Sequence, residues 1–319
     1  MKLDIGRNKG NMYKKIIGIL VLTLLVTTAL PAMGTMTEKE DDQNIGGRGG
    51  IFRQLPSPHG DPQPVGWISD VRLGWKVYED FWDVTSPICD IYWWGQTPYW
   101  DGSTWQPCEP IGMTVDITFY EDDGGKPGAI FCSYDDVVPE YIPTGIMYDY
   151  PEFPNGPFEL IYFKYELDTC CNLSDGWFSI QSIDSDNDCS FGWFESPDGN
   201  DILIQNSIQR TTDVAFIFTD GEESGIEINV KSGFGVTLEV TNSGTETLTG
   251  IPVDVIVYGG IFGKIKVYVR ETINLDPGDT TSVGTGVFLG LGKIAIGVIV
   301  DEEVEYEKGK QLLILTIIQ

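Results

Sequence analysis

Short runs of β-branched and aromatic residues recur along this chain, and clusters of Gly, Pro, Asp and Asn separate them. Runs of this composition favour β-strands, and the clusters between them favour tight turns. The segment Asp201–Arg210 could form a short helical turn, but nothing between the runs predicts a crossover helix. Strands joined by short turns pair antiparallel, so the sequence predicts an all-β protein built from sandwiches.

The composition changes along the chain, which predicts two domains. All 9 Trp and all 6 Cys lie between Trp67 and Trp193. We expect a jelly-roll-like, disulfide-stapled β-sandwich of about eight strands over residues 65–219. Residues 220–319 contain no Trp or Cys and are rich in Val, Ile, Gly and Thr. About seven strands in about 100 residues predict an Ig-like β-sandwich there.

The N-terminal residues predict export. Two lysines precede the apolar run Ile16–Leu30, and small residues follow it up to Gly34. This order is that of a secretory signal peptide, which we place at residues 1–34. The run is shorter than the ~20 residues of a membrane span, so we expect no span after signal removal. A retained anchor and a start at Met12 stay open as alternatives.

Residues 35–64 combine a charged cluster with Gly-rich and Pro-rich stretches, so we expect a disordered linker. This segment contains His59, the 1 His of the chain. Nucleophilic hydrolases of the Ser-His-Asp or Cys-His type need a histidine base, so the sequence argues against that chemistry. A glycosidase needs two carboxylates ~5–10 Å apart, and this alternative stays open.

The chain is strongly acidic, with 48 Asp+Glu, 20 Lys+Arg and a net charge of −28 at pH 7. Phosphate binding needs clustered Lys and Arg, so we expect no nucleic-acid partner, and an anionic membrane surface is disfavoured. Such a charge favours cations as partners. Together with the signal, it predicts a secreted or cell-surface protein whose partner is an extracellular glycan or a surface protein.

An even number of cysteines in an exported chain predicts up to three disulfides. The cysteines are Cys89, Cys108, Cys132, Cys170, Cys171 and Cys189. Short loops favour Cys89–Cys108 and Cys171–Cys189, at ~3 kcal/mol each, which leaves Cys132 for Cys170. Neighbouring residues of a strand point to opposite faces, so we expect Cys170 and Cys171 to have different partners. Without a C-x-x-C pair, a zinc site is not indicated.

The stretch Glu79–Gly95 is the centre of the predicted first domain. It reads as two short strands rich in aromatic and β-branched residues. Strand alternation places Cys89 and Trp93 on one face, which we expect to be buried. Tyr92 and Trp94 then share the other face, which is either exposed or covered by a loop.

Aromatic side chains around this strand predict a ligand site. Tyr92, Trp94, Trp100 and Trp105 lie on the strand or in the loop Gln96–Glu109, which is rich in Trp, Tyr and Asp. Flat rings stack on the C–H faces of sugars, and nearby carboxylates and amides bind sugar hydroxyls. The alternative is that these rings cap one end of the sandwich core.

Three aspartates predict a candidate calcium site. Asp184, Asp186 and Asp188 stand at alternate positions, with Glu195 at the twelfth position, which partly matches a calcium loop. A cysteine stands where that loop needs glycine, and no flanking helices are predicted. A looser structural calcium site here or at Glu121–Asp123 is one interpretation, and a solvated acidic turn is the other. No further cofactor is predicted.

Two family resemblances add to this interpretation. Gly235–Leu275, with V-T-N-S-G-T and I-N-L-D-P-G-D-T, resembles the CARDB-type Ig-like modules of archaeal and bacterial surface proteins. The resemblance covers most of Gly221–Gln319 and implies a spacer or adhesion module. The first domain, with Q-L-P-S-P, E-D-F-W-D-V and C-D-I-Y-W-W-G, resembles an uncharacterised β-sandwich domain of exported archaeal and bacterial proteins. It implies no catalytic residues.

These observations favour an exported, non-catalytic binding or adhesion protein that binds glycan through its aromatic loop. One alternative is a purely structural component of a cell envelope or assembly. Another is a carbohydrate-active hydrolase that uses paired carboxylates. Export also makes Asn172 a candidate glycosylation acceptor, because Asn172-Leu173-Ser174 fits the N-x-S/T pattern and should be exposed.

Overall fold

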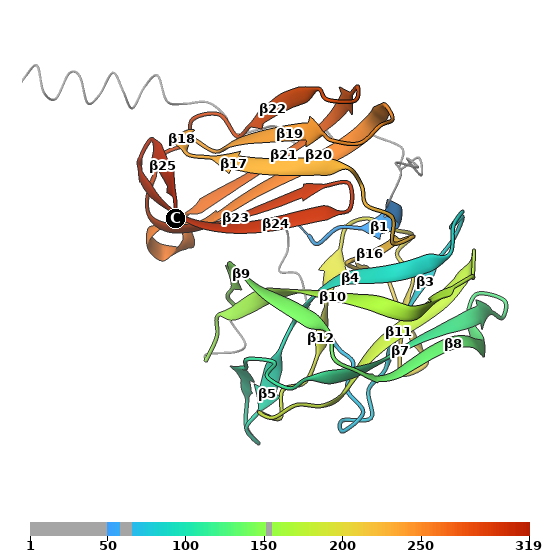
Figure 1. Cartoon of the computed structure of the whole chain (residues 1–319). Helices are drawn as coiled ribbons and strands as arrows, with labels where there is room; N and C mark the ends of the chain where they lie inside the picture. Colours follow the sequence, from blue (N-terminus) through green and yellow to red (C-terminus); the bar gives the residue numbers. More distant parts are fainter. Residues whose placement is uncertain (1–49, 58–65, 151–154) are drawn as a thin grey trace, which may run out of the picture. The chain divides into compact units, whose positions relative to one another are not determined.

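The computed structural model describes residues 50–57, 66–150 and 155–319. The predicted signal, and most of the predicted linker with His59, lie outside these residues. The described chain folds into strands, with one 3-10 turn, η1, at Ile261–Gly263 (Figure 1). The prediction of an all-β, disulfide-stapled sandwich fold is confirmed.

The first sandwich contains the strands between Gly50 and Thr219. Their bounds are β1 Gly50–Gln54, β2 Gly66–Ile68, β3 Val77–Phe81, β4 Ile88–Gln96, β5 Pro98–Trp100, β6 Trp105–Pro107, β7 Thr114–Asp122, β8 Pro127–Val137, β9 Glu140–Tyr148, β10 Phe158–Cys171, β11 Gly176–Asp184, β12 Gly192–Ser196, β13 Leu203–Gln205, β14 Ile208–Arg210, β15 Asp213–Val214 and β16 Phe216–Thr219.

Two antiparallel sheets form this sandwich. The 8-stranded sheet has the order β1-β16-β4-β10-β9, and β12 joins it by pairing with β4, β2 and β15. The 6-stranded sheet has the order β14-β13-β3-β11-β7-β8. Large rings fill the space between them, including Trp93, Phe163, Phe178, Trp193 and Phe216, all fully buried.

Sequence alternation accounts for the buried faces of these strands. In β7, Val115, Ile117 and Phe119 lie in the core, as their spacing predicts. In β4, Trp93 is buried as expected, whereas Cys89 is half-buried. Alternation therefore identifies the core face well along the middle of a strand and less well at its end.

The second sandwich contains the strands between Ile226 and Ile318, in the upper part of Figure 1. Their bounds are β17 Ile226–Lys231, β18 Gly233–Phe234, β19 Thr237–Asn242, β20 Leu248–Gly259, β21 Ile265–Leu275, β22 Thr280–Gly284, β23 Gly290–Val300, β24 Glu303–Leu313 and β25 Leu315–Ile318. A 3-stranded sheet, β17-β19-β22, packs on a 6-stranded sheet, β18-β25-β24-β23-β20-β21. Aliphatic side chains such as Val255, Ile296 and Val298 fill its core.

Two local expectations are wrong. Strand β1 lies inside the segment predicted to be a disordered linker; it pairs with β16, and Ile51 and Leu55 on this segment are buried. The polar composition of residues 35–64 as a whole concealed this short apolar run. The segment Asp201–Arg210 forms the β13–β14 hairpin instead of a helical turn, because Asn206 and Ser207 take positive φ at its tip.

All 6 cysteines form disulfides, but the predicted pairing is wrong. The bonds are Cys89–Cys170, Cys108–Cys189 and Cys132–Cys171. The error came from favouring short loops, whereas an antiparallel sheet brings together residues far apart in sequence. Strands β4 and β10 pair directly, which places the first cysteine pair side by side. The expectation that neighbouring cysteines of β10 have different partners is confirmed.

The described residues of both sandwiches belong to one compact unit and share an apolar cluster. Trp94 and Ile217 of the first sandwich join Ile256 and Ile299 of the second in this cluster. Trp94 Nε1 donates a hydrogen bond to the hydroxyl of Tyr306 at 2.6 Å. The second sandwich therefore covers part of the outer face of the 8-stranded sheet.

Charged groups also connect the two sandwiches. The guanidinium of Arg53 on β1 lies 3.6 Å from the buried Asp254 carboxylate on β20. Arg270 on β21 lies 2.7 Å from Asp254 and 3.8 Å from Asp198 of the first sandwich.

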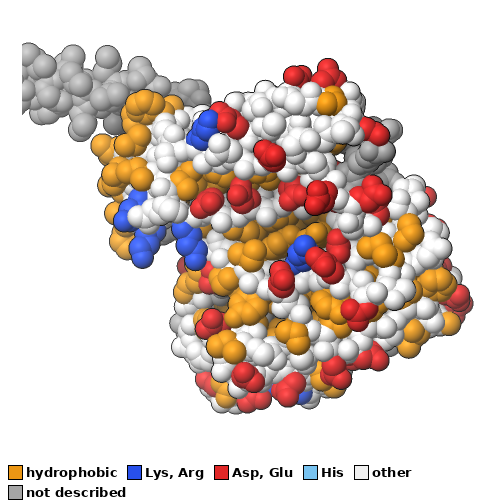
Figure 2. All heavy atoms as spheres, viewed as in Figure 1, with side chains coloured by type: hydrophobic (Ala, Val, Ile, Leu, Met, Phe, Trp, Pro, Cys, Tyr) orange, Lys and Arg blue, Asp and Glu red, His pale blue; other side chains and the backbone are white. Residues whose placement is uncertain are grey.

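On the face shown in Figure 2, acidic side chains are spread over both sandwiches, in keeping with the negative net charge.

Candidate functional site

A cavity of about 260 Å³ lies in the first sandwich, between the ends of β4 and β12 and the β5–β6 hairpin. We call it the aromatic cavity. Its walls carry five rings, those of Trp67, Trp75, Trp105, Tyr150 and Phe158. Tyr150 and Phe158 are buried, whereas Trp75 is 40% exposed. The cavity therefore has a buried apolar part and a rim that solvent can reach.

Glycines keep the cavity open. Gly66 on β2 and Gly192 on β12 both line it. A Cβ atom at Gly192 would lie 3.2 Å from Ile68 Cδ1, and one at Gly66 would lie 3.4 Å from Gln96 Oε1. Larger residues at these two positions would extend into the cavity beside Gln96. Glycine leaves that space open.

Gln96 is the buried polar group of this cavity. Its Oε1 accepts a hydrogen bond from the hydroxyl of Tyr150 at 2.8 Å. Its Nε2 is buried and has no hydrogen-bond partner among the described residues. A buried donor without a partner costs free energy, so a ligand oxygen that accepts from Nε2 would be stabilised.

Other polar groups fix the rings at the rim. Trp67 Nε1 donates to Glu195 Oε1 at 3.0 Å, and the Arg210 guanidinium lies 5.2 Å from the centre of the Trp67 ring. Gln205 Nε2 donates to the carbonyl oxygen of Ile68 at 3.0 Å. These contacts hold Trp67 in place before any ligand binds, which lowers the entropic cost of binding.

The β5–β6 hairpin presents the third tryptophan of the cavity. The Asp101 carboxylate accepts hydrogen bonds from the backbone N–H groups of Ser103 and Thr104, both at 2.8 Å, and from Gln106 Nε2. These hydrogen bonds lower the pKa of Asp101 below its usual range. The carboxylate thus stays charged and holds the turn that positions Trp105.

The structure places the four aromatic residues of the predicted ligand site in different surroundings. Trp105 lines the aromatic cavity, and Trp100 packs edge-on against it with ring centres 5.2 Å apart. Trp94 is 0% exposed beneath the second sandwich, and Tyr92 stacks on Tyr162. Of these four rings, Trp105 is the one that lines the described walls of the aromatic cavity, and a ligand role for the other three stays a prediction. Alternation placed Tyr92 and Trp94 on an outer face correctly, but another sandwich covers that face.

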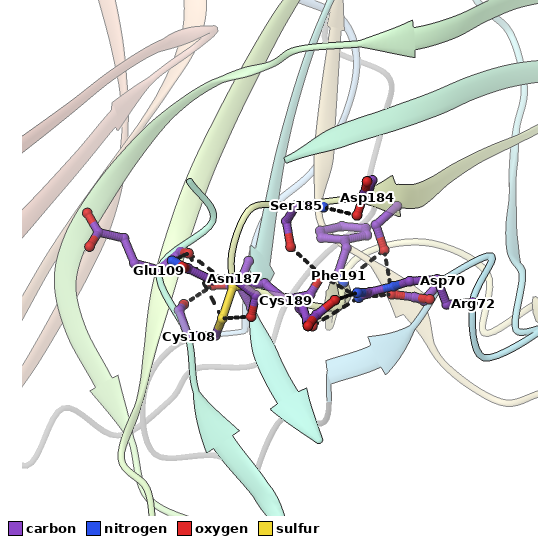
Figure 3. Close-up of a disulfide and its surroundings, with 12 residues drawn as sticks. Asp70, Arg72, Cys108, Glu109, Asp184, Ser185, Asn187, Cys189 and Phe191 are labelled. Carbon is purple, nitrogen blue, oxygen red and sulfur yellow. Dashed lines mark hydrogen bonds and ion pairs between the residues drawn. A yellow bond between two sulfur atoms is a disulfide. The ribbon is translucent and has the colours of Figure 1, made fainter. Parts of the chain in front are cut away.

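The structure does not gather the three aspartates of the predicted calcium loop into a site. Asp184 accepts a hydrogen bond from the backbone N–H of Ser185 (Figure 3). Asp188 pairs with Arg72 at 3.0 Å. Arg72 also donates to the carbonyl oxygen of Cys189, next to its disulfide with Cys108. The Arg72 side chain and the Cys108–Cys189 disulfide thus stabilise this acidic turn.

In the other acidic turn, groups of the protein also bind the central carboxylate. In Glu121–Asp123, the Asp122 carboxylate accepts hydrogen bonds from Trp177 Nε1 at 2.8 Å and from the backbone N–H of Gly125. These bonds lower the pKa of Asp122. Asn172 lies in the turn after β10 and is exposed, as a glycan acceptor must be; its modification stays a prediction.

Sequence reasoning missed Trp67, Trp75 and Gln96 as cavity residues. Strand β2 has 3 residues, too few for an alternating pattern to identify it. A buried acidic cluster of Glu79, Asp80 and Asp213 was missed as well. Asp213 lies far from the neighbouring Glu79 and Asp80 in the sequence, so no spacing motif could connect it with them.

Comparisons with known proteins add little to this picture. No family model matches the chain, and no curated protein matches it. One solved structure, titled "Crystal structure of putative beta-galactosidase from bacteroides fragilis", is 12% identical with a TM-score of 0.17. The alignment covers 83% of this chain and 33% of that chain, so this chain spans about a third of that protein. A likeness this weak carries no argument about function.

Two further observations concern location. The three disulfides are typical of an oxidising, extracellular-type compartment. Within residues 50–57, 66–150 and 155–319, no helix is long and apolar enough to cross a membrane.

Proposed function

We propose that this is an exported, secreted or surface-associated binding protein that binds carbohydrate in the aromatic cavity. The observation that carries the proposal is the buried Gln96 Nε2, which has no hydrogen-bond partner among the residues that the structure describes, in a cavity walled by Trp67, Trp75 and Trp105. Tryptophan faces stack on the C–H faces of a sugar ring, while the amide donates to a hydroxyl oxygen.

The size and chemistry of the cavity favour binding of a short sugar over hydrolysis. Its volume of about 260 Å³ is near the lower end of the ~300–1,000 Å³ typical of ligand sites, which suits a single ring or a chain end. The described residues that line it are aromatic, aliphatic, amide and glycine residues without a carboxylate, whereas glycoside hydrolysis needs two carboxylates ~5–10 Å apart. We therefore propose that the protein binds without catalysis.

The second sandwich fits the role of a spacer or support. It covers Trp94 and holds the 8-stranded sheet through Tyr306 and the ion pair of Arg53 with Asp254. The predicted resemblance to CARDB-type modules agrees with such a role. Support for the sheet would keep the cavity walls in place when the protein is attached to a surface.

A structural or assembly role is the second candidate, and exposed apolar side chains favour it. Phe234, Phe262 and Leu313 on the second sandwich are more than half exposed. Such side chains on a soluble surface often mark contacts with a partner. Self-association that rises with protein concentration, without sugar binding, would favour this role over the first.

Screening on a glycan array, followed by calorimetry with the best ligand, tests carbohydrate binding. We expect Trp105→Ala and Gln96→Leu each to weaken binding by roughly 10-fold or more, because each removes a direct contact worth about 1–3 kcal/mol. Tyr99→Ala is the matched control, since Tyr99 lies on the same hairpin, is exposed and does not line the cavity. No retention of any glycan, or equal losses for Tyr99→Ala and Trp105→Ala, would contradict the proposal.

A further inference from the structure

One end of the second sandwich has a composition unlike the rest of the chain. Four segments meet there through strand pairing: residues 231–237, 259–266, 284–293 and 308–319. The chain has 48 Asp+Glu, yet these segments contain none. They contain six exposed lysines: Lys231, Lys264, Lys266, Lys293, Lys308 and Lys310. We call this region the apolar end, because exposed hydrophobic side chains lie beside the lysines (Figure 2).

Strand pairing arranges these side chains in rows across the 6-stranded sheet, because residues paired on neighbouring strands point to the same face. The row nearest the end is apolar and exposed: Phe234, Leu315, Leu312 and Leu291. Two residues further along each strand, Lys293 pairs with Lys310, which pairs with Ile317. Two residues of a strand span ~7 Å, so a band of lysines follows directly behind the apolar row.

Two turns at this end expose large apolar side chains to solvent. Phe262 in η1 has a φ of 61° and is 90% exposed, and Leu313 in the β24–β25 turn has a φ of 60° and is 60% exposed. Such positions normally take Gly, Asn or Asp, which adopt positive φ more readily. Turn η1 packs on the same end of β23, since a Cβ at Gly292 would lie 3.0 Å from the Ile261 nitrogen. Local folding therefore does not explain why these residues are apolar, whereas contact with an apolar partner does.

The lysines identify the chemistry of that partner. Lys231 pairs with Glu239, whereas the other five form no ion pair within the described residues. Their charges are open to an anionic partner, and the apolar row ahead of them needs an apolar phase. A bilayer surface has this order, with hydrocarbon beneath anionic headgroups that extended lysine side chains reach. Protein interfaces, in contrast, are depleted in Lys, and Leu and Val contribute few of their strongest contacts.

The negative net charge does not oppose this contact locally. It argues against an anionic surface for the chain as a whole, but salt screens charges beyond ~8 Å at physiological ionic strength. The charged side chains of the four segments are all lysines. The charges nearest to a bound surface are therefore positive.

We propose that the apolar end docks this protein on the surface of a bilayer that contains anionic lipid. Phe262, Leu313 and the apolar row enter the outer part of the hydrocarbon, while Lys293 and Lys310 bind the headgroups. The contact lies on the second sandwich and does not involve the aromatic cavity, so it is independent of carbohydrate binding. It attaches the protein to a membrane surface without a membrane span.

Cosedimentation of the oxidised full chain with phosphatidylcholine vesicles, with and without about 30% phosphatidylserine, tests the proposal. We expect binding that rises with phosphatidylserine and falls as NaCl is raised, because salt screens the lysines. Each lysine near an anionic surface strengthens binding roughly 5-fold, so Lys293→Gln with Lys310→Gln should weaken it by about 25-fold. Lys126→Gln, on the exposed β7–β8 turn, is the matched control and should bind like the wild type.

A second pair of substitutions tests the apolar contact. Phe262→Asn with Leu313→Asn keeps both positive-φ turns, since Asn adopts this conformation readily, and should weaken binding by roughly 10-fold or more. Ile208→Asn is the matched control, because Ile208 is 55% exposed on the β13–β14 hairpin of the first sandwich. We expect it to leave binding unchanged.

Three results would overturn the proposal. One is wild-type binding that does not depend on phosphatidylserine. Another is binding that survives either pair of substitutions, as binding through the apolar run Ile16–Leu30 would. The third is self-association without vesicles that Phe262→Asn with Leu313→Asn abolishes, which would assign the apolar end to contacts between copies of this chain.

Discussion

Replacing Glu302 with Gln should remove much of the pH dependence of folding stability. Glu302 lies in the buried turn between β23 and β24, and neither of its carboxyl oxygens has a hydrogen-bond partner among the described residues. Burial, together with the negative charges of Asp301, Glu303 and other nearby carboxylates, raises the pKa of Glu302 to about 9. The folded protein therefore holds a proton on this group at neutral pH.

The size of the effect follows from proton linkage. The unfolded chain releases the Glu302 proton near pH 4.5, whereas the folded chain keeps it up to about pH 9. Between these values the folded state binds more protons, so the free energy of unfolding falls as the pH rises. Each pH unit costs about 1.4 kcal/mol, which gives a loss of about 3 kcal/mol between pH 4.5 and 7.

Urea unfolding of the oxidised full chain at about pH 5, 7 and 9 measures this loss. Glutamine does not ionise, so Glu302→Gln should match the wild type near pH 5 and exceed it by roughly 3 kcal/mol at pH 7. Glu222→Gln, on an exposed loop, is the control and should follow the wild-type curve. If wild type and Glu302→Gln change in parallel across the whole range, the reasoning about this buried carboxyl group is refuted.

Two further predictions test the contact between the sandwiches and the disulfide pairing. Trp94→Phe removes the hydrogen bond to Tyr306 and part of a buried ring, so we expect it to lower the free energy of unfolding by about 1–3 kcal/mol; Trp100→Phe should change it by less than about 0.5 kcal/mol. Replacing Cys108 and Cys189 by Ser opens a loop with a sequence separation of 81 and should cost ~4–5 kcal/mol in urea unfolding. Peptide mapping without reductant should recover these two cysteines in one linked peptide, and finding them in separate pairs would contradict the fold.

Local pattern predicted much of the fold. The alternation Val115, Ile117, Phe119 identifies the buried face of β7, because the side chains of a strand point to its two faces in turn. The neighbouring Cys170 and Cys171 had to find different partners for the same reason. Both conclusions need only the geometry of one strand, which the sequence encodes directly.

The candidate site depends on packing between several strands and between the two sandwiches. Trp94 and Trp105 look alike in the sequence, yet one lies under the second sandwich and the other lines a cavity. Whether each ring is buried or lines a cavity depends on which face of the sheet another sandwich covers, and no local sequence pattern predicts that.

The sequence alone thus determined that this chain forms disulfide-stapled β-sandwiches with alternating buried faces. The tertiary structure decided that Cys108 forms a disulfide with Cys189 and that Gln96 lies in a cavity with three tryptophans. It also decided that the carboxyl groups of Glu79 and Asp213 lie close together. The physical reason is that antiparallel pairing brings residues separated by tens or hundreds of positions into contact. Such contacts depend on how whole sheets pack, whereas burial along a strand depends on its nearest neighbours.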